Sequence, residues 1–310
     1  MSKFNIYEKI NNQVLEGLEK QGMRWFMPWK SGREHQPMNY VTGKYYRGFN
    51  PWMLDMVMRE TNWEHNQWMT YKQAESKGGQ VITGSKASSV YFFKVSYKDN
   101  KTGKYHNEPT EDSEQVWALR YYNVFNIAQV EGLEPIKLEA EPMPENEPIN
   151  KKKKRLYKVA NGVCDSYLER EKITLKEEAY KNMFEGGGSA YYHPKEDYIG
   201  MPLKKSFQDH DSYYKTLFHE MAHSTGHESR LNRKGITEVL KWGDETYAKE
   251  ELVAEISAMY LTGLIGLEPH DSVMNSQVYI KNWCKKLKDK PRECVYAMSQ
   301  ATKVVEFIQG

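Results

Sequence analysis

The segment from Glu131 to Asn150 constrains the fold most, because it divides the chain. It carries four prolines and six glutamates, and the basic run KKKKR follows it directly. Helices and strands rarely tolerate proline at this density, so the segment has the character of a solvated linker. The sequence therefore predicts two domains, residues 1–130 and 156–310, joined by an acidic and basic linker over residues 131–155. A chain of 310 residues is long enough for a core in each domain.

The first domain is expected to be α+β, because helical periodicity and strand-type composition alternate along it. Helices are indicated by apolar residues at spacing four and by a proline in a first helical turn. Strands are indicated by runs of β-branched and aromatic residues. The expected elements are helices over residues 5–21, from Asn50 onward and over residues 68–77 after Thr70, and strands on both sides of a turn at residues 99–103, the second over residues 115–125.

The second domain is expected to consist of helices around short extended segments, so the whole chain is assigned to the α+β class. One helix should pass through the sequence HEMAH and end at Gly226, with Asp211 or Ser212 as its N-terminal cap. The other expected elements are helices from about Leu156 to Arg170 and over residues 247–264, and two extended pieces around a turn within residues 190–202.

The motif HEMAH predicts a metal centre. On a helix, His219 and His223 project from one face about one turn apart, where both imidazoles can bind one Zn²⁺. Glu220 is rotated by roughly 100° from His219 and does not occupy a ligand position. Zinc lowers the pKa of a bound water toward ~7, and Glu220 is the expected base that takes its proton.

A catalytic zinc ion usually has three protein ligands, so the motif needs a third. His227 continues the spacing of four, but a straight helix would spread the three histidines over roughly 12 Å. A bend at Gly226 keeps His227 as a candidate ligand. The metzincin pattern fails, because Ser229 stands where that subclass has its third histidine.

The next helix offers a better third ligand. Glu251 and Glu255 are four residues apart in YAKEELVAEISAMYL. This arrangement resembles that of gluzincin metallopeptidases, which implies that Glu251 binds the metal and Glu255 orients a ligand histidine. Glu250 remains the alternative in register, and Mn²⁺ remains an alternative to Zn²⁺.

Other residues could complete a peptidase site. Tyr247 or His227 could donate a hydrogen bond to the oxyanion of a tetrahedral intermediate. The segment AYYHPKEDYIGMP is typical of the edge strand on which zinc peptidases align an extended peptide. His193 within it is expected to be a packing residue rather than a ligand.

The first domain also has the composition of a single-strand binder. Residues 65–105 contain seven lysines against Glu75 and Asp99, and six of the eight tryptophans lie in the first 130 residues. Single-strand binders combine basic grooves with aromatic rings on which bases stack. We expect Trp25, Trp52 and Trp117 to be core residues, and direct DNA contact by KKKKR is the less favoured interpretation of that run. The expected DNA-binding residues are Tyr45, Tyr46, Arg47, Trp68, Lys72, Lys86 and Lys94.

Cysteine usage and apolar segments indicate the compartment. Cys164, Cys284 and Cys294 show no C-x-x-C spacing, which favours free thiols in a reducing cytoplasm. The N-terminal sequence does not resemble a secretory signal, and no apolar run approaches ~20 residues. We therefore expect a cytoplasmic protein with no membrane partner.

Motifs along nearly the whole chain resemble those of ArdC-like antirestriction proteins. In the first half these are WFMPW, NYVTGKYYRGFNPWML, WMTYKQAESKGGQVITGSK and YYNVFNIAQVEG, and in the second half YHPKEDYIGMP, YYKTLFHEMAHSTGHESRLNR and YAKEELVAEISAMYL. The resemblance implies an N-terminal single-stranded-DNA-binding domain and a C-terminal zincin-like metallopeptidase domain. It also implies a protein of conjugative plasmids and related mobile elements that protects incoming DNA from host restriction.

Two functions remain open at this point. The chain could be a zinc peptidase held at single-stranded DNA, cleaving a protein such as a host restriction component. It could instead shield single-stranded DNA without catalysis, with a structural or vestigial metal site. DNA hydrolysis is a weaker third possibility, because nucleases usually bind Mg²⁺ or Mn²⁺ at sites rich in carboxylates.

Overall fold

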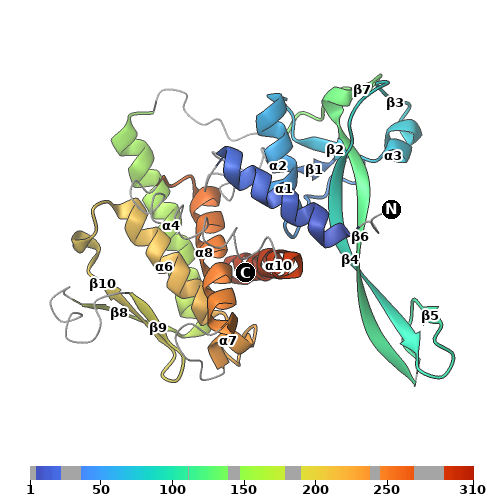
Figure 1. The fold of residues 1–310 in the computed structure, drawn as a ribbon. Coiled ribbons are helices and arrows are strands. Elements are labelled where there is room, and N and C mark those ends of the chain that lie inside the picture. Colours follow the sequence, from blue (N-terminus) through green and yellow to red (C-terminus); the bar gives the residue numbers. More distant parts are fainter. Residues whose placement is uncertain are drawn as a thin grey trace. The chain divides into compact units, whose positions relative to one another are not determined.

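The chain folds into two compact units, each built from helices and a sheet (Figure 1). The predicted α+β class is therefore confirmed. Among the helices in the described part of the chain, none combines the length and the apolar character that a bilayer crossing requires. One unit contains Met1–Lys9 and Gln36–Lys137, and the other contains Ile10–His35 and Leu138–Gly310. The computed structural model describes residues 5–21, 36–110, 112–138, 147–178, 190–237, 245–268 and 290–310.

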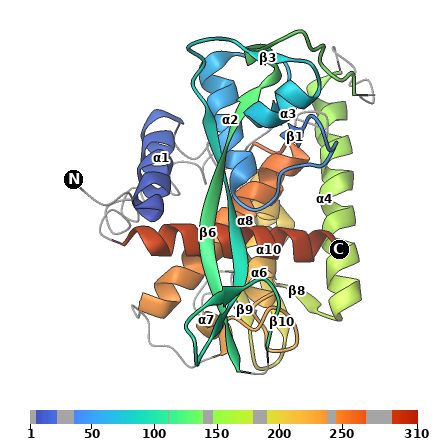
Figure 2. The same ribbon diagram turned by 90° about the vertical axis from the view of Figure 1, so that its right-hand side faces the viewer.

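The first unit is organised around a five-stranded sheet of order β1-β2-β6-β4-β5. Its long strands β4 and β6 pair antiparallel over their length and form the twisted ribbon seen in Figure 2. The turn that leaves β4 is the predicted one, and Gly103 adopts a φ of 69° there. The strands are β1 (Met38–Asn39), β2 (Gln67–Met69), β4 (Ser88–Asp99), β5 (Tyr105–His106) and β6 (Ser113–Asn126).

Helices and a short second sheet complete this part of the fold. Leu54 of α2 packs with Trp68, Val90 and Val124 in one of the cores of the unit. Thr70 accepts a hydrogen bond from the Gln73 amide in a capping box and so starts α3, as predicted. The elements are α1 (Ile6–Gln21), which begins in this unit, α2 (Asn50–Thr61), α3 (Tyr71–Ser76), a 3-10 helix (Ile127–Gln129), and the paired strands β3 (Gln80–Val81) and β7 (Val130–Glu131).

Trp68 departs from two predictions. It belongs to β2 rather than to the predicted helix over residues 68–77, and its side chain is fully buried. Its indole Nε1 donates a hydrogen bond to Asn66 Oδ1 at 2.6 Å. A ring held in this way cannot stack on a nucleic-acid base. Trp52 is fully buried, as predicted for a core residue, whereas Trp25 and the side chain of Trp117 lie outside the described residues.

The ends of the predicted linker are ordered. The amide of Gln67 exchanges hydrogen bonds of 2.6 and 2.9 Å with the backbone of Ile136, and Leu133 packs beside Met69 and Val130. Helix α4 begins at Ile149, seven residues before the expected start, and includes the KKKKR run. The side chain of Leu133 and the backbone of Ile136 therefore hold the first part of the acidic segment against the first unit.

The second unit surrounds helix α6 (His210–Ser224) with other helices and a small sheet. Helix α10 crosses α8 in Figure 2. Cys164 and Cys294 are both buried. Strand β10 pairs parallel with β8 and antiparallel with β9, so β9 is an edge strand. The elements are α4 (Ile149–Glu171), β8 (Thr174–Glu178), β9 (Tyr191–His193), β10 (Tyr198–Pro202), a 3-10 helix (Lys204–Ser206), α7 (Lys234–Thr237), α8 (Glu245–Ile265) and α10 (Pro291–Gln309).

The start of α6 differs from the prediction. Asp209 is the cap, because its Oδ1 accepts a hydrogen bond from the Ser212 amide at 2.7 Å. Asp211, one of the two expected caps, is buried and instead accepts hydrogen bonds from the Tyr157 hydroxyl and the Glu268 amide, and Ser212, the other, donates to the actual cap. Asp211 thereby ties α6 to α4 and to the segment that follows α8.

Asp55 in α2 provides a test of the packing in the first unit. Burial raises the pKa of its carboxyl to about 7, although Arg59, 2.8 Å away, acts in the opposite direction. The folded state therefore holds a proton that the unfolded state releases above pH ~4, and stability falls as pH rises from ~4 to ~7. We expect Asp55→Asn to raise stability by about 1–3 kcal/mol near pH ~8 and to have little effect near pH ~4, measured by amide exchange of α2.

Candidate metal centre

Helices α6 and α8 lie side by side and bring three potential ligands together. The Nε2 atoms of His219 and His223 are 3.1 Å apart. The two carboxylate oxygens of Glu251 lie 3.5 Å from Nε2 of His219 and 3.4 Å from Nε2 of His223. Within the described ranges, this trio is the one group of His, Cys, Asp and Glu side chains that could hold a metal ion.

The spacing of these atoms fits a divalent ion. Two ligand atoms bound ~2.1 Å from one ion at a tetrahedral angle lie about 3.4 Å apart. The Nε2 atoms of the two histidines, 3.1 Å apart, are close to this value, and each of them has one Glu251 oxygen at a similar distance, 3.5 Å for His219 and 3.4 Å for His223. Two imidazole nitrogens and one carboxylate form a donor set of the kind found in catalytic zinc sites, and manganese accepts the same atoms.

Two further carboxylates lie behind the histidines. Glu255 Oε2 is 3.3 Å from Nδ1 of His219, and Glu250 Oε1 is 3.3 Å from Nδ1 of His223. A carboxylate at Nδ1 fixes the tautomer that leaves Nε2 available as a ligand atom. Glu250 thus contacts the rear of a histidine and is not in the trio, so the geometry favours Glu251 over Glu250 as the third ligand.

Each of these rear carboxylates contacts a buried cation. Lys215 Nζ lies 2.7 Å from Glu255, and Arg233 donates to both oxygens of Glu250 at 2.9 and 2.5 Å. Arg233 also donates to the carbonyl of Ala222, within α6 itself. A Cβ at Gly235 would lie 2.6 Å from Cβ of Glu250, so the close approach of α7 to α8 requires glycine at that position.

The charge of the site favours a cation between the histidines. Burial alone would lower the pKa of His219, but hydrogen bonds to Glu251 and Glu255 and the charge of Glu220 raise it to about 10. Burial also opposes the charge on His223, while Glu250, Glu251 and Glu220 raise its pKa to about 9. The surrounding carboxylates are therefore arranged to compensate positive charge at this point.

The remaining residues predicted for the site lie in different places. Glu220 is buried in α6, one residue from His219. His227 lies beyond the end of α6, where its Nδ1 is 2.8 Å from the Ser229 hydroxyl, and it is not part of the trio. Tyr247 lies in the first turn of α8, and its side chain is outside the described residues.

The segment AYYHPKEDYIGMP forms the β9–β10 hairpin, which is fixed to the end of α6. Arg230, in the loop after α6, donates to both oxygens of Asp197 and also contacts the hydroxyl of Tyr192. The Arg230 Nε donates to the carbonyl of Ser224 at 2.7 Å. His193 stacks on Tyr198, with ring centroids 5.1 Å apart, which agrees with the packing role predicted for it. The edge strand and the metal helix are thus tied together through one guanidinium group.

The sequence does not indicate the roles of Arg233 and Lys215. It indicates Glu250 only as an alternative ligand. Arg233 lies in a loop, and its partner is seventeen residues away on another helix, so no spacing rule points to the pair. Lys215 lies four residues before His219, on the helical face that meets α8. This spacing is the one feature of the sequence that could have indicated that Lys215 lies near the metal site.

The predicted DNA-binding residues lie in the first unit. Tyr45 is 38% exposed, whereas Tyr46 is half-buried, packs beside the core that contains Trp68 and accepts a hydrogen bond from Asn39. Gly43 and Gly48, with φ values of 66° and 69°, shape the loop that carries these tyrosines. Trp68, as described, is buried in the core. The other predicted cations, which are exposed, are Arg47, Lys72, Lys86 and Lys94.

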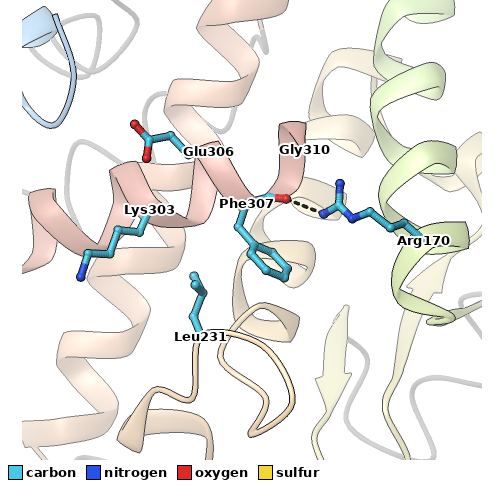
Figure 3. Close-up of a pocket in the computed structure, with 6 residues that line it drawn as sticks. All are labelled: Arg170, Leu231, Lys303, Glu306, Phe307 and Gly310. Carbon is cyan, nitrogen blue, oxygen red and sulfur yellow. Dashed lines mark hydrogen bonds between the residues drawn. The ribbon is translucent and has the colours of Figure 1, made fainter.

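A separate cavity of about 510 Å³ lies in the second unit between α4, the loop after α6 and α10 (Figure 3). Leu231 and the ring of Phe307 provide apolar walls, while Arg170 donates a hydrogen bond to the Phe307 carbonyl. Lys303 and Glu306 also line the cavity. None of the three metal-site residues is among its walls, so we do not assign it to the metal centre.

Family models match both halves of the chain. Residues 4–125 match the model of the N-terminal domain of anti-restriction factor ArdC. Residues 171–300 match the model of a zincin-like metallopeptidase.

Solved structures are similar over nearly the whole length. The chain resembles the metal-free crystal structure of the antirestriction protein ArdC from the R388 plasmid, with 30% identity and a TM-score of 0.68. The Mn(II)-bound crystal structure of the same protein has 28% identity and a TM-score of 0.69. Each comparison covers 99% of this chain and 97% of that chain.

Curated relatives include much longer proteins. Two DNA primase TraC proteins from Escherichia coli are each 31% identical over 97% of this chain, and the chain spans 20% and 27% of their lengths. The protein y4eC of Sinorhizobium fredii is 27% identical over 308 residues, which is 99% of this chain and 92% of that protein. The first two relatives therefore share about a fifth to a quarter of their length with this chain.

Proposed function

Because this chain belongs to the family of ArdC antirestriction proteins, we propose that it protects the DNA of a mobile element in the cytoplasm by acting at single-stranded DNA. Its second unit would be a metal-dependent peptidase. The observation that carries the proposal is the trio of His219, His223 and Glu251, whose ligand atoms lie within 4.8 Å of one another. A peptidase held at DNA would cleave a protein bound there, such as a component of the host restriction system.

His219, His223 and Glu251 would hold a divalent metal, with Zn²⁺ and Mn²⁺ as the candidates. When bound, the metal supplies Lewis-acid chemistry, which polarises a carbonyl and activates water. Glu220 is the proposed general base, since it is buried in α6 beside His219 and carries a carboxylate that can accept a proton. Glu255 and Glu250 would keep the two imidazoles oriented through Nδ1.

The β9 strand is the proposed site for the polypeptide substrate. It is an edge strand, and an extended peptide can add to such an edge through backbone hydrogen bonds. Contacts of Arg230 with Asp197 and Ser224 keep the hairpin in a fixed position relative to α6. Tyr247 remains a proposed donor to the oxyanion.

The first unit would supply the DNA contacts. Tyr45 and Arg47 are exposed in a loop shaped by glycines, and Lys72, Lys86 and Lys94 are exposed cations of the same unit. Arginine and lysine contact the phosphates, while exposed rings stack on bases. Primase activity of the TraC relatives belongs to proteins about four to five times as long and is not proposed for this chain.

Glu220→Gln tests the peptidase proposal. The variant keeps the size of the side chain but removes the base, so we expect it to bind metal and single-stranded DNA as the wild type does and to lose protection against restriction. The measurement is the survival of unmodified transferred DNA in a restricting host, with metal content and oligonucleotide affinity determined on the purified protein. Glu228→Gln, at an exposed position beyond α6, is the matched control and should keep full protection.

Shielding of single-stranded DNA without catalysis is the second candidate, and it is favoured by the exposed cations of the first unit. Under that function Glu220→Gln would protect as well as the wild type. A Tyr45→Ala, Arg47→Gln double variant that binds DNA weakly yet protects fully would instead argue against shielding.

A further inference from the structure

The ribbon of β4 and β6 carries a pair of stacked aromatic rings, one half-buried and one exposed. Phe92 and Tyr122 have ring centroids 4.7 Å apart and an interplanar angle of 10°. Tyr122 is 58% exposed, although tyrosine of a folded domain usually buries most of its ring. The pair lies next to the part of the sheet that α2 covers, because Tyr122 is directly opposite the core residue Val90.

Two cations lie on the same face of the ribbon. Residues opposite each other in an antiparallel pair share a face, and so do residues two apart along a strand. Arg120 is opposite Phe92, and Lys94 is opposite Ala118. Both cations are exposed, and neither has an acidic residue as its partner in the register. We call Phe92, Lys94, Arg120 and Tyr122 the ribbon platform.

A hydrogen-bonded amide connects the ribbon platform to the loop of Tyr45 and Arg47. Asn50 Nδ2 donates to the carbonyl of Arg47 at 3.0 Å and to the carbonyl of Tyr91 at 2.7 Å. Its Oδ1 accepts from the Tyr91 amide at 2.6 Å. Since one nitrogen bonds to both carbonyls, the backbone of Arg47 lies beside the residue that precedes Phe92.

We propose that the ribbon platform binds single-stranded nucleic acid, with a base stacked on Tyr122 and phosphates contacted by Lys94 and Arg120. The proposal rests on the proposed DNA function and identifies a binding surface outside the loop, in which Phe92, Arg120 and Tyr122 join Lys94, a cation already proposed to contact DNA. Arg47, through its link to β4, would direct the strand from the loop onto the platform. The basic charge of the platform suits phosphates, and stacking needs an accessible ring, which the buried Trp68 cannot offer.

The composition of the platform favours a nucleic acid over a protein partner. Protein interfaces are usually apolar at their centre and depleted in lysine. Here the exposed ring is flanked along the strands by Lys94 and Arg120. Along the paired strands, the acidic residue on this face that lies nearest to the platform is Glu114, and it is opposite a different lysine, Lys98. Alternating rings and cations along one face are typical of surfaces that follow a single strand.

The test is the affinity of the full chain for a fluorescent oligothymidylate, measured by anisotropy at several salt concentrations. Tyr122→Ala is expected to weaken binding roughly 5- to 150-fold, the effect of losing one stacked base. Tyr122→Phe keeps the ring and should retain wild-type affinity. Lys94→Gln and Arg120→Gln should each lower the slope of log affinity against log salt by about 0.7.

Further measurements separate the possible outcomes. Tyr105→Ala removes a ring that is 63% exposed on β5, outside the platform, and should leave affinity unchanged. An abasic oligonucleotide should bind the wild type and Tyr122→Ala equally, because it has no base to stack. If the wild type binds oligothymidylate and Tyr122→Ala binds equally well, the platform is not the site. If the wild type itself does not bind, the proposed DNA function fails as well.

Discussion

Glu251→Ala is expected to lower the affinity of the protein for Zn²⁺ and Mn²⁺ by at least roughly 1000-fold. The change removes one of three ligands, and two histidines one turn apart form a much weaker site than a closed set of three. One oxygen of Glu251 lies 3.5 Å from Nε2 of His219 and the other lies 3.4 Å from Nε2 of His223, so the alanine variant loses the carboxylate at both histidines. Competition with a metal-sensitive dye, run on the full chain near neutral pH, measures the change.

Three variants serve as comparisons for this result. Glu255→Ala removes the carboxylate behind His219 and should lower affinity by about 10- to 100-fold, less than Glu251→Ala. His227→Ala should leave metal affinity unchanged, because that ring contacts Ser229 outside the trio. Glu228→Ala, an exposed substitution in the same loop, should also have no effect. An affinity lost in His227→Ala but kept in Glu251→Ala would assign the third ligand to the histidine instead.

Arg233→Met is expected to destabilise the second unit by about 3–5 kcal/mol. The substitution leaves the Glu250 carboxylate buried, with 5% of its surface exposed, and without the guanidinium that donates to both of its oxygens. A hydrogen bond to the Ala222 carbonyl in α6 is lost at the same time. Amide exchange of α6 and α8 in the metal-free protein reports the loss for this unit alone.

A second substitution distinguishes an unpaired charge from lost packing. Arg233→Met combined with Glu250→Leu removes both partners and should recover most of the stability, because an apolar pair avoids the cost of an isolated buried charge. Arg155→Met removes a more exposed ion pair with Glu147 and should cost less than about 1 kcal/mol. If Arg233→Met costs no more than Arg155→Met, the buried pair does not support the metal helix.

The metal trio could be predicted from two signals: the helical spacing of the histidines, and the resemblance to gluzincin metallopeptidases, which implied Glu251 as the third ligand. A spacing of four places His219 and His223 on one face of their helix, and the same spacing places Glu251 and Glu255 on one face of the next helix. Periodicity did not distinguish Glu250 from Glu251, because the two are adjacent and a rotation of α8 by one residue position would exchange their places. Only the packing of α8 on α6 decided which carboxylate meets Nε2 and which meets Nδ1.

The ribbon platform could not be predicted in the same way. Whether Tyr122 lies beside Phe92 depends on the register between β4 and β6, and the connection between these strands is long and contains β5. Trp68 was misassigned for a related reason. Its local sequence resembles a helix start, but pairing with β1 and β6 places it in a strand and buries its ring.

The amide of Asn50 has a consequence for the association of this protein with itself. The outer edge of a sheet exposes unpaired N–H and C=O groups, which allow a strand of another molecule to pair with it. At Tyr91 the Asn50 side chain occupies both groups, as a neighbouring strand would, and β5 covers β4 further along at Tyr97 and Lys98. The edge of β4 is therefore obstructed at two points, which opposes aggregation of a protein whose first unit depends on one long exposed ribbon.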